Sequence, residues 1–148
     1  MAEMEVFAGG TRAITEGEWA GWRNWAPDPW EDQGGPFFYR VDAQNKVTCA
    51  FKAEPKHMNG GGFMHGGCMM TFADYALFCI AKDHLGDGRA VTVTMNSEFL
   101  KSAQVGQFME ATGEVVRGGR QLIFLRGTIT ADGTPVMAFS ATLMKLGG

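Results

Sequence analysis

Residues 68–86 read CMMTFADYALFCIAKDHLG, and this stretch decides the fold. Apolar side chains occur on all sides of a helix drawn through it, which predicts a helix buried on most of its faces. Gly86 is a C-cap candidate and ends the predicted helix. No other stretch predicts a long helix, so the remaining elements have to cover this one.

Strands are predicted on both sides of the helix, because short β-rich runs and alternating apolar and polar residues occur there. Gly118-Gly119 and Asp132-Gly133 are hairpin-turn sequences, so the last three strands form an antiparallel meander. A curved antiparallel sheet wrapped around one central helix is therefore the predicted α+β architecture. The predicted strands cover residues 37–41, 47–51, 91–99, 106–117, 121–131 and 134–146.

Residues 1–36 differ from the single domain predicted over residues 37–148, because they contain all four tryptophans. Trp19 and Trp22 are three residues apart and can share one face of a helix. Pro27 and Pro29 would end such a helix. We predict a short helix that docks its tryptophan face onto the domain, and packing is favoured over a lid on a binding site.

Charge and cysteine content narrow the class of protein. The chain has 148 residues, with 13 Lys and Arg against 16 Asp and Glu and a net charge of −3. No nucleic-acid partner is expected, because phosphate contacts need clustered basic residues. Three cysteines without paired spacing predict reduced thiols. No signal-peptide pattern is present, and residues 68–81 are fewer than the roughly 20 that span a bilayer, so we expect a cytoplasmic protein without membrane contact.

Asp74 lies in the middle of the most apolar helix, where an unpaired carboxylate is costly. One interpretation is structural: the carboxylate caps a neighbouring strand or pairs with an arginine such as Arg89. The other is proton chemistry in a site. Gly66 and Gly67 favour the second interpretation, because free N–H groups at a helix N-terminus can stabilise a carbonyl oxygen that gains negative charge.

The spacing of these groups predicts a shared site. Asp74 is eight residues from Gly66, or about 12 Å along one helix. One chain is not expected to place both groups on a single carbonyl. Two antiparallel copies of the helix could do so, with the site between the subunits of a dimer.

Other site patterns are missing. His57, His65 and His84 lack metal-ligand spacing, so no metal is expected. The glycine-rich loop lacks the Lys-Ser/Thr of a phosphate-binding loop, no Gly-x-Ser-x-Gly elbow is present, and no cofactor is expected. Cys68 could be an activated thiol at the helix N-terminus, but a small buried hydrophobe is the favoured interpretation.

The run Asn59-Gly-Gly-Gly-Phe-Met-His65-Gly66-Gly67, followed by Asp74, resembles the hot-dog fold acyl-CoA thioesterases. The resemblance is to the phenylacetate-degradation type, the branch that includes thioesterase superfamily member 2. It covers roughly residues 36–146, including the order of the helix and strands. It does not extend to hot-dog hydratases, which place a histidine differently.

The resemblance implies a role for each matching residue. Asp74 would attack the thioester or activate the water that does, and the N–H of Gly66 would hold the thioester oxygen. Asn59 would orient the water or the carbonyl, and His65 would shape the loop near the leaving sulfur. Thr92, at a position where the family also has serine, would help to place the water. In this family the Asp and the hydroxyl come from one subunit and the Asn and His-Gly from the other.

The resemblance also implies a coenzyme A site at the end of the strand after the helix and at a hairpin. Charge-assisted contacts to phosphates would come from Arg117 and Arg120, although a solvated turn arginine is an equally good interpretation for either one alone. The implied partner is a second copy, in a homodimer or a dimer of dimers with shared active sites. The implied contacts to coenzyme A are Gly67, Phe99, Lys101, Ser102, Arg117, Gly118, Gly119 and Arg120.

The predicted function is hydrolysis of an aryl or medium-chain acyl-CoA to the free acid and CoA, without metal or organic cofactor. The alternative is a non-catalytic acyl-CoA-binding or lipid-binding module on the same fold. The presence of Asp74, Asn59 and Thr92 argues against such a module, because a binding module has no need of a buried carboxylate. A hydratase is disfavoured because its motif is missing.

Overall fold

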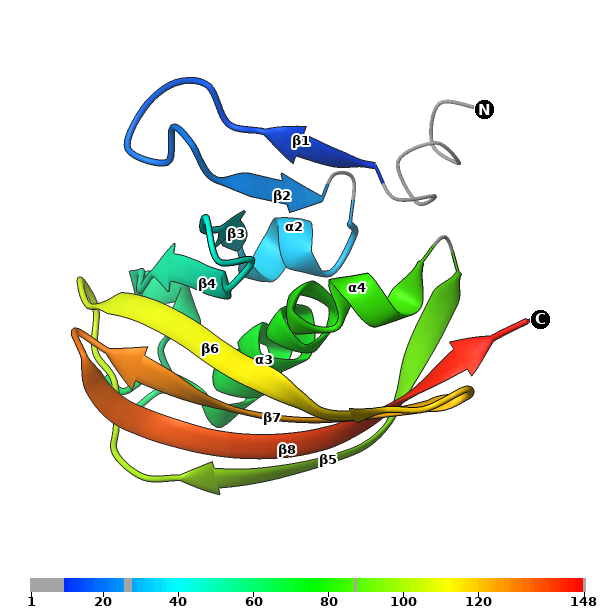
Figure 1. Cartoon of the computed structure of the whole chain (residues 1–148). Helices are drawn as coiled ribbons and strands as arrows, with labels where there is room; N and C mark the ends of the chain where they lie inside the picture. Colours follow the sequence, from blue (N-terminus) through cyan, green and yellow to red (C-terminus); the bar gives the residue numbers. More distant parts are fainter. Residues whose placement is uncertain (1–9, 26–27, 87, 148) are drawn as a thin grey trace.

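The computed structural model describes residues 10–25, 28–86 and 88–147. Within them, one antiparallel sheet of eight strands has the order β1-β2-β3-β4-β6-β7-β8-β5. Figure 1 shows the long strands curving around helix α3 without closing into a barrel. The strands are β1 (Thr11–Ala13), β2 (Arg23–Trp25), β3 (Phe38–Val41), β4 (Val47–Lys52), β5 (Arg89–Phe99), β6 (Phe108–Gly118), β7 (Leu122–Ala131) and β8 (Thr134–Leu146).

The predicted central helix is present, but it forms two helices. Helix α3 (Gly66–Ile80) begins at the glycines expected at its N-terminus, and α4 (Lys82–Leu85) follows a break at Ala81. Two shorter elements, α2 (Glu31–Gly34) and the 3-10 turn η1 (Pro55–His57), lie before them. None of the helices in the described residues is long and apolar enough to cross a membrane.

The core lies between α3 and the concave face of the sheet. Phe72, Ala73 and Leu77 of the helix are fully buried there. Burial of each large apolar side chain contributes about 1.5–3 kcal/mol, so this contact stabilises the wrapped sheet. The buried partners on the strands include Phe51, Met109, Ile123, Leu125, Ile129, Met137 and Leu143.

The predicted meander of β6, β7 and β8 is confirmed by antiparallel pairing along these strands, with one register shift in each pair. Asp132 and Gly133 connect β7 to β8 with φ of 48° and 84°, the left-handed values that a tight hairpin turn needs. Strand β5 pairs with β8 only and forms one edge of the sheet.

Strand β5 departs from the alternation in its sequence, where Val91, Val93 and Met95 alternate with polar residues and Thr92 is predicted to lie on the polar face. A register shift between Thr92 and Thr94 marks a β-bulge, which lets the strand change the face that its side chains point to. Thr92 therefore reaches helix α3, whereas Val91 and Val93 are 39% and 46% exposed.

The predicted tryptophan helix at Trp19 and Trp22 is wrong. Strands β1 and β2 form an antiparallel hairpin instead, and the loop between them turns at Gly17 and Gly21, which have φ of 79° and 92°. The glycines favour these turns because residues with a Cβ rarely adopt positive φ. Residues 1–9, 26 and 27, including Pro27, lie outside the described residues.

The aromatic face of the hairpin packs on the strands of the sheet. Trp19 stacks on Phe38 and Phe108, with ring centroids 4.3 and 5.7 Å apart, and Trp22 is buried beside them. Strand β2 also pairs with β3 through Arg23 and Tyr39, so the hairpin continues the sheet.

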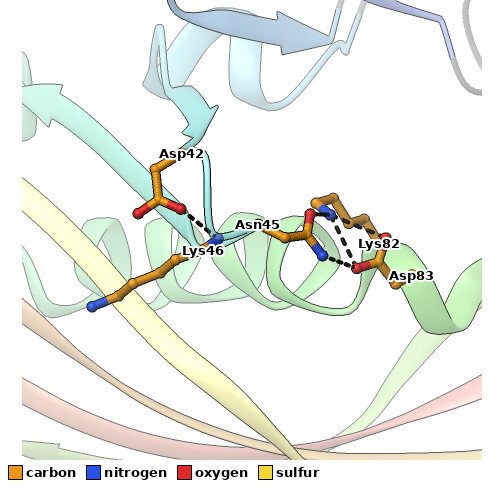
Figure 2. Close-up of polar contacts among 5 residues, drawn as sticks. All are labelled: Asp42, Asn45, Lys46, Lys82 and Asp83. Carbon is orange, nitrogen blue, oxygen red and sulfur yellow. Dashed lines mark hydrogen bonds and ion pairs between the residues drawn. The ribbon is translucent and has the colours of Figure 1, made fainter.

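A polar cluster fixes α4 against the turn between β3 and β4 (Figure 2). Asn45, in the turn, donates to Asp83 at 2.6 Å and accepts from Lys82 at 2.7 Å. Lys82 also forms an ion pair with Asp83 at 3.0 Å. Asp42 accepts the backbone N–H of Lys46 and so closes the turn. This cluster holds the end of the long helical segment, which borders the cavity described below.

Candidate active site

The structure brings Asp74 and Thr92 together. Asp74 lies in the middle of α3, and the bulge in β5 turns Thr92 toward it, so that Thr92 Oγ1 donates to Asp74 Oδ1 at 2.6 Å. Asp74 is half-buried rather than enclosed in the core. Arg89 forms no ion pair with Asp74 in the described part of the chain, so the arginine pairing considered for this carboxylate is not found.

Asp74 opens into two adjoining recesses. The larger, of about 530 Å³, lies among β2, β3, α3, α4 and the start of β5, and aromatic side chains line it. The smaller, of about 450 Å³, lies between the N-terminal segment and α3. Asp28, Glu31 and Asp74 line both. We call the two recesses together the Asp74 cavity.

Glu31 was missed by the sequence reasoning. Burial is the largest cause that raises the pKa of Glu31 to about 8, and the Asp28 charge and a side-chain hydrogen bond with Asp28 add to it. Asp74 and Asp32 contribute smaller repulsions. No sequence signal identified this residue, because it lies on a four-residue helix whose position depends on tertiary contacts.

The start of α3 is organised by His65 and Gly66. His65 is the N-cap residue, and its Nδ1 accepts the Gly67 N–H at 2.9 Å. A Cβ at Gly66 would lie 3.4 Å from the Phe99 ring, so the glycine allows the end of β5 to approach the helix N-terminus closely. The Gly66 N–H, as one of the first of the helix, has no intrahelical acceptor.

Asn59 and His65 lie apart from Asp74 in this chain. Asn59 Oδ1 accepts the N–H groups of Gly61 and Phe63 at 2.9 and 3.1 Å, which shapes the glycine-rich loop. Both side chains are exposed at the N-terminal end of α3. One chain therefore presents two half-sets of candidate residues: Asp74 with Thr92, and Gly66 with Asn59 and His65.

The residues predicted to bind coenzyme A also fall into two groups. Phe99, Lys101 and Ser102 lie at the C-terminal end of β5, and Phe99 pairs with Met137 of β8. The 117–120 hairpin lies at the other end of the strands, since Arg117 is in register with Phe124, which pairs with Thr142 of β8. Met137 and Thr142 are five residue steps apart along β8, so the two groups are about 17 Å apart.

The glycines and the thiol have structural explanations. Gly118 packs against the His84 ring of α4 and leaves no room there for a side chain. Burial raises the pKa of Cys68 to about 11, which agrees with a buried hydrophobe rather than an activated thiol. Across residues 10–25, 28–86 and 88–147, no three His, Cys, Asp or Glu side chains converge as metal ligands.

Comparison with known proteins identifies the chain as similar to thioesterases. The thioesterase superfamily matches residues 61–138. "Putative esterase PA0474" of Pseudomonas aeruginosa is 36% identical over 97 residues, which cover 65% of this chain and 72% of that protein. Acyl-coenzyme A thioesterase 13 of Homo sapiens is 32% identical over 96 residues, covering 62% of this chain and 66% of that protein.

A solved structure supports the same relationship. The zebra fish thioesterase superfamily member 2 superposes with a TM-score of 0.68 at 28% identity, covering 82% of this chain and 90% of that chain. Together with the sheet that curves around α3, this likeness confirms the predicted hot-dog fold.

Proposed function

Because the chain belongs to the thioesterase superfamily and is a thioester hydrolase, we propose that its substrate is an acyl-CoA and that Asp74 is the catalytic carboxylate. The observation that carries the proposal is the short hydrogen bond from Thr92 to Asp74, at the mouth of a cavity. A hydroxyl that donates to one oxygen fixes the carboxylate and leaves the other oxygen free to act.

The proposed reaction assigns one step to each of these groups. Asp74 attacks the thioester carbonyl carbon, or removes a proton from the water that attacks it. The carbonyl oxygen gains negative charge and accepts a hydrogen bond from the Gly66 N–H at the positive end of the helix dipole. The C–S bond then breaks, and CoA leaves as the thiolate and takes up a proton. If Asp74 activates the water, this step releases the free acid directly. If Asp74 attacks, the acyl group is left on Asp74 as a mixed anhydride, which a water molecule hydrolyses to the free acid and the restored carboxylate.

A dimer completes this arrangement. Strand β5 is an eleven-residue edge strand with exposed apolar side chains, a surface that favours pairing with another strand. We propose that β5 pairs antiparallel with β5 of the partner subunit. The C-terminal end of one β5, which carries Phe99, then lies next to the N-terminal half of the other β5, which carries Thr92. Gly66, which contacts Phe99, then approaches Asp74 of the partner subunit.

The same pairing joins the two coenzyme A groups. The β6–β7 hairpin with Arg117 and Arg120 lies near the start of β5, so it meets the Lys101 end of β5 in the partner. The acyl group enters the Asp74 cavity, whose larger recess has walls formed by Tyr39 and Phe78. Aromatic walls and a volume of about 530 Å³ suit an aryl or medium-chain acyl group.

The decisive experiment measures thiol release from aryl, short, medium and long acyl-CoAs with the wild type and Asp74→Asn. The variant keeps the shape of the side chain and removes its charge. We expect a loss of at least about a hundredfold, the lower end of acid–base contributions. Binding of acyl-CoA without turnover by either protein would instead favour the non-catalytic module.

Complementation tests the shared site. Asp74→Asn and Asn59→Ala subunits are each expected to be weakly active alone. A mixed dimer contains one site with both wild-type residues, so co-expression restores activity. Mixed dimers that stay as inactive as the parents would show that each site uses residues of one chain only.

A further inference from the structure

The N-terminal segment brings a second carboxyl into the Asp74 cavity. Glu31 opens helix α2, and two hydrogen bonds hold this helix to the domain. Trp30 Nε1 donates to Thr71 Oγ1 at 3.2 Å, one turn before Asp74 on α3. The His57 ring, whose other nitrogen is occupied by a backbone N–H, donates from Nε2 to the Gly34 carbonyl at 2.6 Å.

The cavity has an unsatisfied polar group as well as carboxyls. Tyr75 lines the larger recess and is 3% exposed, yet its hydroxyl has no hydrogen-bond partner among the described residues. Buried polar groups are nearly always bonded, so this hydroxyl is an unsatisfied polar group in the buried surroundings of the recess.

No cation neutralises Glu31 in the described part of the chain. Lys82 lines the larger recess but is bound to Asn45 and Asp83, and Arg89 forms no ion pair. The titratable and charged groups that face Glu31 are Asp28 and Asp32 of its own segment, Asp74, Tyr75 and Cys79 of α3, Lys82 of α4 and Arg89 of β5.

We propose that Glu31 is a specificity-determining residue: it stands in the cavity as an uncharged carboxylic acid, and only this acid form admits an apolar acyl group. The inference rests on the proposed function, because it takes the Asp74 cavity as the acyl site. Burial and the neighbouring carboxylates hold the pKa of Glu31 near 8, so the acid form dominates at neutral pH.

The physical reason is desolvation. An apolar chain that packs against an ionised carboxylate strips it of water. Lys82 and Arg89 also line the larger recess, but within the described residues neither forms an ion pair with Glu31 that would compensate this cost. If only the acid form binds, the apparent affinity falls with the fraction of acid form. A pKa of about 8 then gives about a tenfold weaker affinity at pH 9 than at pH 7. The effect falls on KM rather than on kcat.

The test uses S-octyl-CoA, a thioether that cannot be hydrolysed. Calorimetry at pH 7 and pH 9 compares the full-length wild type with Glu31→Gln, a permanent mimic of the acid form. We expect about a tenfold rise in Kd for the wild type and none for the variant. Free CoA, which has no acyl group, should show no such difference between the two proteins. Glu18→Gln, an exposed position on the same segment, is the matched control and should behave as the wild type.

Three other outcomes of this binding experiment would distinguish between the two proposals. The same pH dependence in wild type and Glu31→Gln would overturn the proposal, as would no binding of S-octyl-CoA at pH 7. If the thioether binds as expected but no acyl-CoA is hydrolysed, the proposed function fails and the role of Glu31 in binding stands.

Two further measurements are independent of activity and of the ligand. The ¹³C carboxyl signal of Glu31, identified by its loss in Glu31→Gln, should titrate near pH 8; a midpoint below pH 6 would contradict the proposal. The stability that protonated Glu31 contributes is present below about pH 4.5 and is lost as the pH rises through about 8. The melting temperature of the wild type should therefore fall relative to Glu31→Gln over this range.

Discussion

Replacing Thr92 with valine tests whether its hydroxyl organises Asp74, the proposed catalytic carboxylate. Valine keeps the shape and the β-branch of threonine, so the strand and its bulge should persist. The change removes one hydrogen bond of 2.6 Å from Thr92 Oγ1 to Asp74 Oδ1. A hydrogen bond to a charged group contributes about 1.5–3 kcal/mol. If the full amount is expressed in the transition state, kcat/KM falls about 10- to 150-fold.

The assay is thiol release from the preferred acyl-CoA, with melting temperature as the check on folding. Thr92→Ser is the matched control, because it retains the hydroxyl and should keep activity within a few-fold of the wild type. Asp74→Asn sets the lower limit. A Thr92→Val enzyme with at least half of the wild-type kcat/KM would refute the reasoning, since the hydrogen bond would then have no role in orienting Asp74.

Three further predictions concern binding, assembly and stability. Joint replacement of Arg117 and Arg120 by alanine should raise KM for acyl-CoA about tenfold and leave kcat unchanged. This corresponds to a loss of about 1.4 kcal/mol of binding free energy. The control Arg126→Ala, which breaks an exposed ion pair with a glutamate, should leave KM unchanged. Val93→Lys on the exposed edge strand should give an inactive monomer by light scattering, and an active monomer would refute the shared site. Trp22→Ala should cost about 3–5 kcal/mol in denaturant unfolding, because this residue is buried between the hairpin and the domain.

The main architecture could be predicted because several local signals agree. The apolar residues around α3 require a cover on most sides, and the turn at Asp132-Gly133 fixes the pairing of β7 and β8. The tryptophan segment lacked such agreement. Trp19 and Trp22 have helical spacing, but Gly17 and Gly21 adopt positive φ and close a hairpin loop instead. Stacking of the tryptophans on strand residues, a tertiary contact, then decides the outcome.

Parts of the candidate site could be predicted where a residue's chemistry is unusual for its position in the sequence. Asp74 conflicts with its apolar helix, and the glycines at 66 and 67 mark a helix start, so both could be found from the residues. The contact between Asp74 and Thr92 could not be derived from the alternation of β5, which placed Thr92 on the polar face; only the resemblance to a family selected it. Glu31 lies 43 residues before Asp74, and no periodicity links the two.

The bulge in β5 connects the two features on which the proposed mechanism depends. Without it, Thr92 and Met95 would lie on opposite faces, because side chains alternate along a regular strand. With it, Thr92 bonds Asp74 and Met95 lines the same cavity, while Val91 and Val93 are left exposed. The same extra residue therefore brings Thr92 to Asp74 and leaves an exposed apolar edge, at which we propose that a second subunit pairs. A variant that regularises the strand by deleting Val93 should lose both properties together, and dimerisation that survives the loss of the Asp74–Thr92 contact would show that the two are separate.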